Sequence, residues 1–256
     1  MISVIICSID ANKFAKVSQN YAARLRGIDH EIVGIHDAES LAEGYNRGIA
    51  QSTGSVLVFS HDDIEILTPD FSAKLLTYLE RYDVVGVAGT SCLTSAVWLE
   101  AWQPFIHGLV VHPDPTNKGY VINVYGVGSA VTEHIQALDG LFFAARRRVA
   151  ESLRFDETTF NGFHCYDLDF TFRAYLAGYR VAVANEITII HESGGSFNEA
   201  WREYSERFMQ KHAGKLCTQK PAKERLACAP VSSKDKILDY CRLPALIELT
   251  QKMRSP

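Results

Sequence analysis

The sequence lacks any run of about 18 consecutive apolar residues, so no segment of it resembles a membrane-spanning helix. The apolar N-terminus, residues 1–7, has no charged stretch before it and is too short for a signal peptide, so we expect a buried strand there. The six cysteines are scattered without a Cys-x-x-Cys pair. This spacing argues against a zinc site or a disulfide framework and predicts reduced thiols in a cytoplasmic protein.

Three common motifs are also missing. No Gly-x-Gly-x-x-Gly follows the first expected strand, where the chain reads Ser8-Ile9-Asp10-Ala11, and this argues against a dinucleotide-dependent dehydrogenase. Neither a Walker A loop nor a Gly-x-Ser-x-Gly elbow occurs. The chemistry must therefore be sought in other residues.

An excess of basic charge is absent as well. The 256 residues hold 26 Lys and Arg against 30 Asp and Glu, and this balance excludes a globally basic nucleic-acid-binding protein. The charge is nevertheless uneven along the chain. Residues 202–256 carry 12 basic and 6 acidic side chains, whereas residues 1–201 carry 14 and 24. An acidic body is thus followed by a basic tail.

Strands and helices are expected to alternate through residue 88. Apolar runs and helical spacing place strands at 3–8, 31–35, 56–60 and 84–88, and helices at 12–26, 41–51 and 69–81. Such alternation predicts βαβ units, and hence an α/β fold with a mostly parallel sheet flanked by helices. Ligands bind such sheets beyond the carboxyl ends of the strands.

The second part of the chain follows another pattern. A hairpin is expected from 109–112 and 120–124 around the turn 113–119, as a small antiparallel excursion that forms one wall of a cleft. An apolar segment at 139–148, a strand at 181–190, a polar linker at 219–223 and helices at 167–177, 199–212 and 235–253 complete the prediction.

Polar side chains follow several of the expected strands. His61-Asp62-Asp63 comes after the third strand, where adjacent carboxylates repel each other and favour a divalent cation held together with substrate phosphates. A solvated turn with an Asp at a helix N-cap is the alternative. His191 ends a later strand and is a candidate metal ligand.

A second group of candidates precedes the helix at 167–177. Asp167 and Asp169 are two residues apart and cannot share a helix face, so one can face a cleft as a general base. Carboxylates that simply favour the helix dipole are the alternative. The aromatic side chains Trp98, Trp102 and Phe105 would either stack on sugar rings or form a small core.

Six short segments in this order resemble the GT-A glycosyltransferases of family 2 and its glycosyltransferase-like branch. They are residues 3–6, 41–49, 61–63 at the Asp-x-Asp position, 137–143, 160–170 with the base, and 191–196. The resemblance covers roughly residues 2–200. Three positions depart from the family pattern: His61 replaces an Asp, Tyr166 replaces the Glu before Asp167, and Cys7-Ser8 replaces Pro-Thr.

The resemblance implies a nucleotide-sugar-binding catalytic domain at 1–200 and a C-terminal helical extension at 201–256. It implies a metal-dependent, inverting glycosyltransferase that moves a sugar from a nucleotide-diphosphate sugar to a hydroxyl of a glycan or lipid-linked acceptor. Asp63 and His191 would hold Mn²⁺ or Mg²⁺, and Asp167 would be the catalytic base. The implied donor-binding residues are Ser8, Asp10, Asp37, Asn46, Arg47 and Asp62, and the acceptor-side residues are Asp139, Gly140, His164, Trp98 and Trp102.

Two other functions are compatible with the same residues. One is a catalytically silent nucleotide-sugar-binding domain of a polysaccharide assembly complex, and the other is a metal-dependent hydrolase or nucleotidyltransferase. The basic tail could lie on the inner membrane face or contact a partner subunit, while a helix that only caps the fold is an equal alternative.

Overall fold

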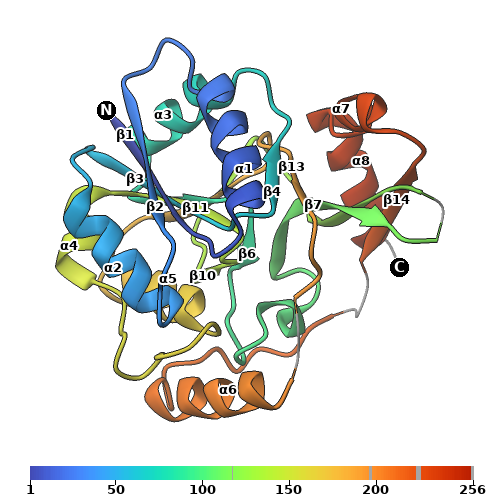
Figure 1. The fold of residues 1–256 in the computed structure, drawn as a ribbon. Helices are drawn as coiled ribbons and strands as arrows, with labels where there is room; N and C mark the ends of the chain where they lie inside the picture. The colour runs from blue at the N-terminus through green and yellow to red at the C-terminus, as the bar shows by residue number, and fades with distance from the viewer. Residues whose placement is uncertain (117, 196–197, 223–225, 255–256) are drawn as a thin grey trace.

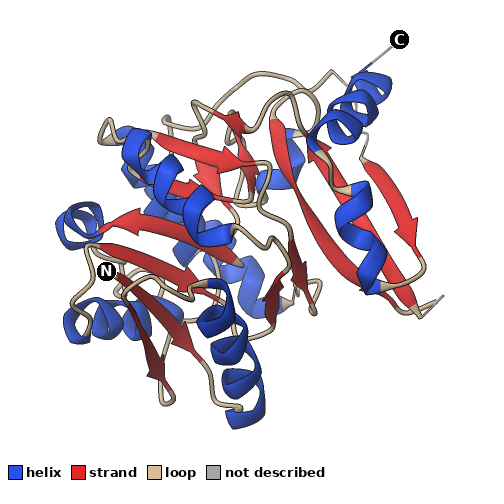
Figure 2. Ribbon diagram, turned by 90° about the horizontal axis from the view of Figure 1, so that it is seen from above, coloured by secondary structure: helices blue, strands red, loops and turns tan. Residues whose placement is uncertain are grey.

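The structure is a computed structural model that describes residues 1–116, 118–195, 198–222 and 226–254. Three predicted segments extend beyond these ranges: the turn at Asn117, the glycine-rich loop at Ser196 and the linker at Lys223. Within the described residues the chain forms two seven-stranded sheets with helices around them (Figure 1, Figure 2).

The first sheet begins with the predicted βαβ units. Its strand order is β2 (His30–Ile35), β1 (Ile2–Cys7), β3 (Val56–Ser60), β11 (Phe142–Arg146), β5 (Val84–Gly86), β12 (Val181–Ala184) and β9 (Val131–Thr132). The pairs β2–β1, β1–β3 and β5–β12 are parallel, but β11 is antiparallel to both of its neighbours. The sheet is therefore mixed rather than mostly parallel as expected, because a strand from the second half of the chain inserts between β3 and β5.

Helices cover both faces of this sheet. They are α1 (Ala11–Arg24), α2 (Leu41–Gln51), α3 (Phe71–Arg81), α4 (Arg147–Leu153) and α5 (Tyr166–Leu176). Consecutive residues of β11 point to opposite faces, since Phe142 packs against Phe71 of α3 while Phe143 packs against Phe170 of α5. Ser40 caps α2 as predicted, by accepting the backbone N–H of Glu43 at 3.0 Å.

The second sheet contains the predicted excursion. Its strands are β10 (Ala137–Leu138), β6 (Ala88–Thr90), β7 (Ile106–Asp114), β13 (Ile189–His191) and β4 (Ile64–Ile66), with β8 (Gly119–Gly126) paired to β7 and β14 (Ala227–Val231) paired to β8. The apolar runs at 84–88 and 181–190 each split into two strands, one in each sheet. Strand β14 was not predicted, because its sequence ACAPV carries little hydrophobic pattern.

The C-terminal segment packs on this second sheet. The helix expected at 235–253 is interrupted, and forms η2 (Lys234–Lys236), α7 (Ile237–Tyr240) and α8 (Leu243–Arg254). Pro244 lies in the first turn of α8, where a missing N–H costs no helical hydrogen bond. Leu246 and Met253 of α8 share a buried cluster with Ile122 and Val124 of β8. Helix α6 (Glu199–Lys211) lies at the bottom of the molecule in the view of Figure 1. The short helix η1 (Trp98–Ala101) contacts β6 and β7.

A disulfide joins Cys92 and Cys217, whose Cα atoms are 5.4 Å apart. The expectation of six reduced cysteines is wrong for this pair. The two residues are 125 positions apart, and they meet because the backbone N–H of Cys217 donates to the carbonyl of Leu93 at 2.8 Å. The bond ties the segment before η1 to the segment after α6.

In the portion of the chain that the structure describes, we find no helix with the length and apolar character needed to span a membrane.

Candidate functional site

A cavity of about 530 Å³ lies where the two sheets meet. Residues of four predicted segments line it: His61 after β3, Asp139 and Gly140 before β11, Asp167 at the start of α5, and His191 at the end of β13. His61, Asp139 and His191 lie at or just after the ends of strands, as expected, whereas Asp167 lies in the first turn of a helix that follows a loop.

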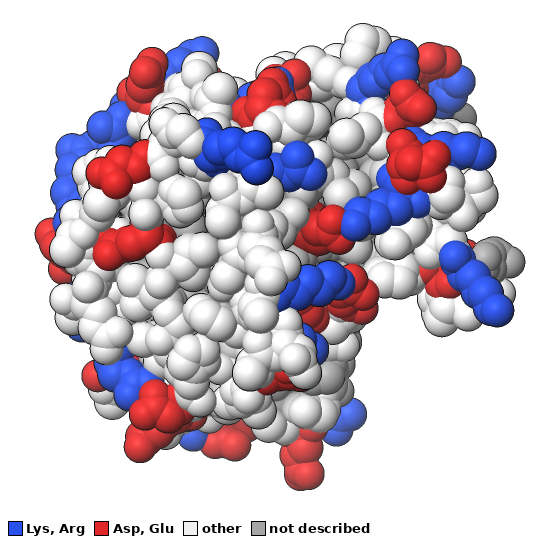
Figure 3. Space-filling view, turned by 45° about the horizontal axis from the view of Figure 1, so that its top comes forward, with Lys and Arg blue, Asp and Glu red and all other residues white. Residues whose placement is uncertain are grey.

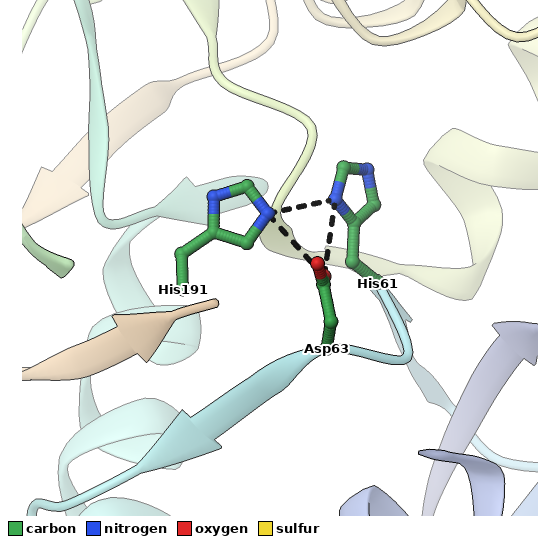
Figure 4. A group of neighbouring side chains, drawn as sticks. All are labelled: His61, Asp63 and His191. Atoms are coloured by element: carbon green, nitrogen blue, oxygen red, sulfur yellow. Dashed lines mark hydrogen bonds and ion pairs between the residues drawn. The ribbon is translucent and has the colours of Figure 1, made fainter. Parts of the chain in front are cut away.

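Three side chains beside the cavity form a group that could hold a metal ion (Figure 4). The Oδ1 atom of Asp63 lies 3.3 Å from Nε2 of His191 and 4.0 Å from Nδ1 of His61, and the two imidazole nitrogens are 3.4 Å apart. All three ligand atoms lie within 4.8 Å of one another, so a single cation could contact them together. Asp63 and His191 are two residues for which the sequence predicts this role.

The electrostatics of this group suit metal binding. Burial raises the pKa of Asp63, but the hydrogen bond and the charge of His191 more than reverse this and hold the pKa below its usual range. Burial and the neighbouring His191 lower the pKa of His61 and favour its neutral form, which is the form that binds metals. Nε2 of His61 lies 2.8 Å from Oη of Tyr166, which fixes the ring with Nδ1 toward Asp63.

His61 was assigned no ligand role from the sequence, because the family pattern has Asp at its position. The structure places its imidazole beside Asp63 and His191. The residue type itself was the available signal, since imidazole is a common metal ligand.

The acceptor-side candidates gather around Asp167. Burial, with a further contribution from the negative charge of Asp139, raises the pKa of Asp167 to about 7. The backbone N–H groups of Leu168 and Gly140 donate to its carboxylate and partly oppose the rise. A Cβ atom on Gly140 would lie 2.7 Å from Oδ2 of Asp167, so the carboxylate fits against a backbone that only glycine provides.

The second carboxylate of this region, Asp139, is already engaged. Its Oδ2 accepts the indole N–H of Trp98 at 2.9 Å, and its Oδ1 accepts the backbone N–H of Leu141 at 3.0 Å. Trp98 is 6 % exposed, packs edge-on against Tyr125 at 4.9 Å, and lines the cavity. It therefore acts both as core and as cavity wall. Trp102 ends η1 with a φ of 47° and is not among the described lining residues.

Cys165, which immediately precedes α5, adopts a left-handed φ of 61° that is costly for a side chain with a Cβ. His164 lines the cavity with its ring 6.2 Å from that of Tyr204 in α6. Asp169 points the other way, as its spacing from Asp167 predicts. It is fully buried, and it accepts from Nε2 of His212 at 2.9 Å and from Nε of Arg173 at 2.7 Å. Asp169 thus holds α6 against α5.

Apart from Asn46, the predicted donor-side residues lie in two groups. Ser8 donates to Oδ2 of Asp62 at 2.6 Å, so these two are brought together beside the metal group. Asp37 and Arg47 form an exposed ion pair at 2.6 Å after β2. Asp10 adjoins Ser8, whose Oγ lies 3.0 Å from the Asp10 carbonyl oxygen, and it caps α1 by accepting the backbone N–H of Asn12 at 2.8 Å.

Asn46 is located differently from this expectation. It is 5 % exposed, its amide N–H donates to the carbonyl of Phe155 at 2.9 Å, and its Oδ1 accepts the N–H of the same residue. Both ends of the amide are therefore used to hold the segment after α4. None of the six predicted donor-side residues is among the described residues that line the cavity.

Several lining residues escaped the sequence reasoning. They are His112, Asn123, Tyr125, Trp201 and Leu226. None stands in a recognisable motif, and they meet only because the second sheet and α6 fold against the first sheet. On the face drawn in Figure 3, acidic and basic side chains are interspersed, without a broad patch of one sign.

Comparisons with known proteins place this geometry in a family. The sequence pattern of the glycosyltransferase-like family matches residues 3–212. No curated protein matches the chain in sequence. The mannosyltransferase PcManGT from Pyrobaculum calidifontis, solved with GDP-Man and Mn²⁺, is 13 % identical with a TM-score of 0.51, over 98 % of this chain and 73 % of that chain.

Two further solved structures are more distant. GalNAc-T7 with UDP, GalNAc and Mn²⁺ is 11 % identical with a TM-score of 0.47, over 77 % of this chain and 44 % of that chain. A197 from STIV is 14 % identical with a TM-score of 0.44, over 75 % and 86 %. The likeness to PcManGT supports the expected GT-A arrangement, and the match over most of the sequence settles the family. This chain belongs to the glycosyltransferase-like family.

Proposed function

We propose that this protein is a Mn²⁺-dependent, inverting glycosyltransferase that moves a sugar from a nucleotide-diphosphate sugar to a hydroxyl of a glycan or lipid-linked acceptor. One observation carries the proposal: a single cavity is lined by two members of the metal-capable group, His61 and His191, and by the half-buried carboxylate of Asp167. The family membership and the GDP-Man and Mn²⁺ of PcManGT agree with it.

The donor set supports Mn²⁺ over Mg²⁺. His61 and His191 offer imidazole nitrogens, and Asp63 offers one carboxylate oxygen. Mg²⁺ prefers oxygen ligands and retains its waters, whereas imidazole suits transition metals. When bound, the ion would neutralise the charge that develops on the leaving diphosphate.

Asp167 is proposed as the general base. A carboxylate with a pKa of about 7 is ionised in a large part of the molecules at neutral pH, and it is basic enough to accept the proton of an acceptor hydroxyl. The resulting oxygen nucleophile would attack the anomeric carbon in line with the departing diphosphate.

Inversion is supported by the position of the other carboxylate. A double displacement needs a second free carboxylate as nucleophile on the sugar. Asp139 is held by Trp98 and by the backbone of Leu141, so it is better suited to orient the acceptor wall and raise the pKa of Asp167.

On the donor side we propose that Ser8 and Asp62 contact the ribose or the sugar, and that Asp37, Arg47 and Asp10 lie near the base. Asn46 would act indirectly, because its amide holds the backbone of Phe155 in the segment after α4.

Cytoplasmic localisation with a peripheral membrane contact through residues 202–256 stays a proposal. Leu238 and Tyr240 of α7 are 37 % and 50 % exposed beside basic residues, a combination that suits an anionic lipid surface. Co-sedimentation of the full chain with phosphatidylserine vesicles tests this, and the absence of binding would refute it.

The function is tested first by a donor screen. Thermal unfolding is measured with Mn²⁺ and UDP-, GDP-, CDP- or TDP-sugars, because a ligand at 100 times its Kd stabilises the folded state by about 2.7 kcal/mol. One nucleotide class should raise the Tm, and NMR should show a transferred sugar of inverted anomeric configuration. Donor hydrolysis without transfer would favour the silent binding domain instead.

A further inference from the structure

The strands β7, β8 and β14 form a twisted ribbon with two different faces. Val110 and His112 of β7, together with Asn123 and Tyr125 of β8, line the cavity. The residues between them, including Leu109, Val111, Ile122 and Val124, belong to the buried cluster under α8. The alternation follows from the two-residue period of a strand, so one face of the ribbon is core and the other is cavity wall.

His112 is held in a defined orientation on the cavity face. Nδ2 of Asn123 lies 2.9 Å from Nδ1 of His112, and the thiol of Cys228 lies 3.2 Å from Oδ1 of the same amide. In this arrangement the amide N–H donates to Nδ1 of His112, while the amide oxygen accepts the weak thiol donor of Cys228. In neutral His112 the proton is then on Nε2, for which no partner exists among the described residues.

The C-terminal extension completes this wall. Strand β14 pairs with β8 so that Cys228 lies opposite Asn123, and Leu226, just before β14, lines the cavity. Both residues follow position 212, where the match to the family ends. Figure 1 shows this segment beside β7 and α8. The tail thus reaches the site through a segment that lies outside the family match.

The ribbon extends from the metal-capable group, where the ring of His112 lies 5.7 Å from that of His191, to the acceptor side of the cavity. The donor-side residues Ser8 and Asp62 follow strands β1 and β3 of the first sheet. Tyr125 of the ribbon instead packs against Trp98, whose indole N–H bonds Asp139 beside Asp167. A group bound on the ribbon would therefore lie near the proposed base.

We propose that the cavity face of this ribbon binds the sugar ring of the acceptor. His112 donates its Nε2–H to an acceptor hydroxyl oxygen, Asn123 is the positioning residue for that ring, and Leu226 contacts the apolar C–H face of the sugar. This inference rests on the proposed function, and it assigns acceptor recognition partly to the C-terminal extension.

The test uses 4-nitrophenyl glycosides of glucose, galactose, mannose and N-acetylglucosamine as acceptor probes. The full chain is supplied with Mn²⁺ and the donor from the screen, and release of nucleotide diphosphate above the rate without glycoside gives the acceptor kcat and KM. The acceptor KM of His112→Phe, which retains a ring without the N–H, should rise about tenfold through loss of one hydrogen bond. His112→Gln retains an N–H and should recover most of the affinity.

Cys228 provides a second readout, the rate at which maleimide labels its thiol, and this rate does not depend on turnover. It is the exposed one of the free cysteines that the structure describes, so a maleimide should label it first. Labelling should abolish glycoside-dependent release but leave donor hydrolysis intact, and an effective glycoside should slow the labelling. Cys228→Ala is the matched control, in which maleimide should have no effect on release.

An unchanged acceptor KM in His112→Phe would overturn the inference. Weaker binding of the nucleotide diphosphate to His112→Phe would also overturn it, because it would put His112 on the donor side. Failure of every glycoside both to stimulate release and to protect Cys228 would also overturn it. The proposed function fails in a different way, namely when the wild type binds no nucleotide sugar or when Asp167→Asn turns over normally.

Discussion

Replacing Asp167 with asparagine is expected to stabilise the fold while it slows the reaction. Burial and the charge of Asp139 raise the pKa of this carboxyl from its ordinary value of 3.8 to about 7. The raised folded-state pKa means that the protonated group contributes stability in full below pH 4. That contribution is lost as the pH rises through 7.

The magnitude follows from the size of the shift. Each pKa unit corresponds to about 1.4 kcal/mol, so an ionised Asp167 costs the folded state about 4 kcal/mol above pH 7. Between pH 5 and pH 8 the stability advantage of Asp167→Asn over the wild type should grow by about 3 kcal/mol. In a chain of this size that is a Tm difference of about 6–12 °C.

The assay is chemical or thermal unfolding of both proteins at pH 5, 6, 7 and 8 with chelator present. Asp139→Asn serves as a partial control, because it removes the second cause of the shift and should leave a smaller dependence on pH. A stability difference between Asp167→Asn and wild type that is constant over this range would refute the assignment of a raised pKa.

Three other perturbations have expected outcomes. Gly140→Ala should lower kcat by about 100-fold, because the added Cβ would displace the base Asp167. Gly128→Ala is the control and should leave kcat unchanged, since an added Cβ there meets nothing within 4 Å. Equal kcat values for the two variants in a steady-state assay would contradict this prediction. His191→Ala should abolish Mn²⁺ binding in calorimetry and activity together, and wild-type activity in EDTA, or fuller recovery with Mg²⁺ than with Mn²⁺, would refute the metal assignment. Substituting Cys92 and Cys217 by serine should lower the free energy of unfolding by about 2–4 kcal/mol in urea titrations, and an unchanged midpoint would argue against the disulfide.

Local pattern was enough to predict much of the first sheet. Helix α2 and strand β3 have the predicted bounds, because apolar periodicity and the Ser40 cap are encoded in neighbouring residues. The mixed strand order was not predictable in this way, since β11 reaches its place between β3 and β5 through contacts remote in sequence.

In the candidate site, too, residues in local motifs could be predicted, whereas residues brought together by contacts remote in sequence could not. Asp63, Asp167 and His191 stand in motifs, so roles for them could be predicted from the sequence. Asp167 and His191 line one cavity, and Asp63 lies beside His191. His112 is near the site because β7 pairs with β8 and β13, and no local pattern marks it. Asn46 shows the opposite case, in which a residue in a family-like segment serves a buried backbone contact.

The role of Asp167 as base is tested most directly by comparing chemistry with binding in Asp167→Asn. The rate of acceptor-dependent nucleotide release and the Kd of the nucleotide diphosphate with Mn²⁺ are measured on the same preparation. We expect the rate to fall by 10²–10⁴-fold, the range of general-base catalysis, with the Kd unchanged within twofold. A wild-type rate in Asp167→Asn, or a loss of nucleotide binding that accounts for the whole effect, would contradict the account.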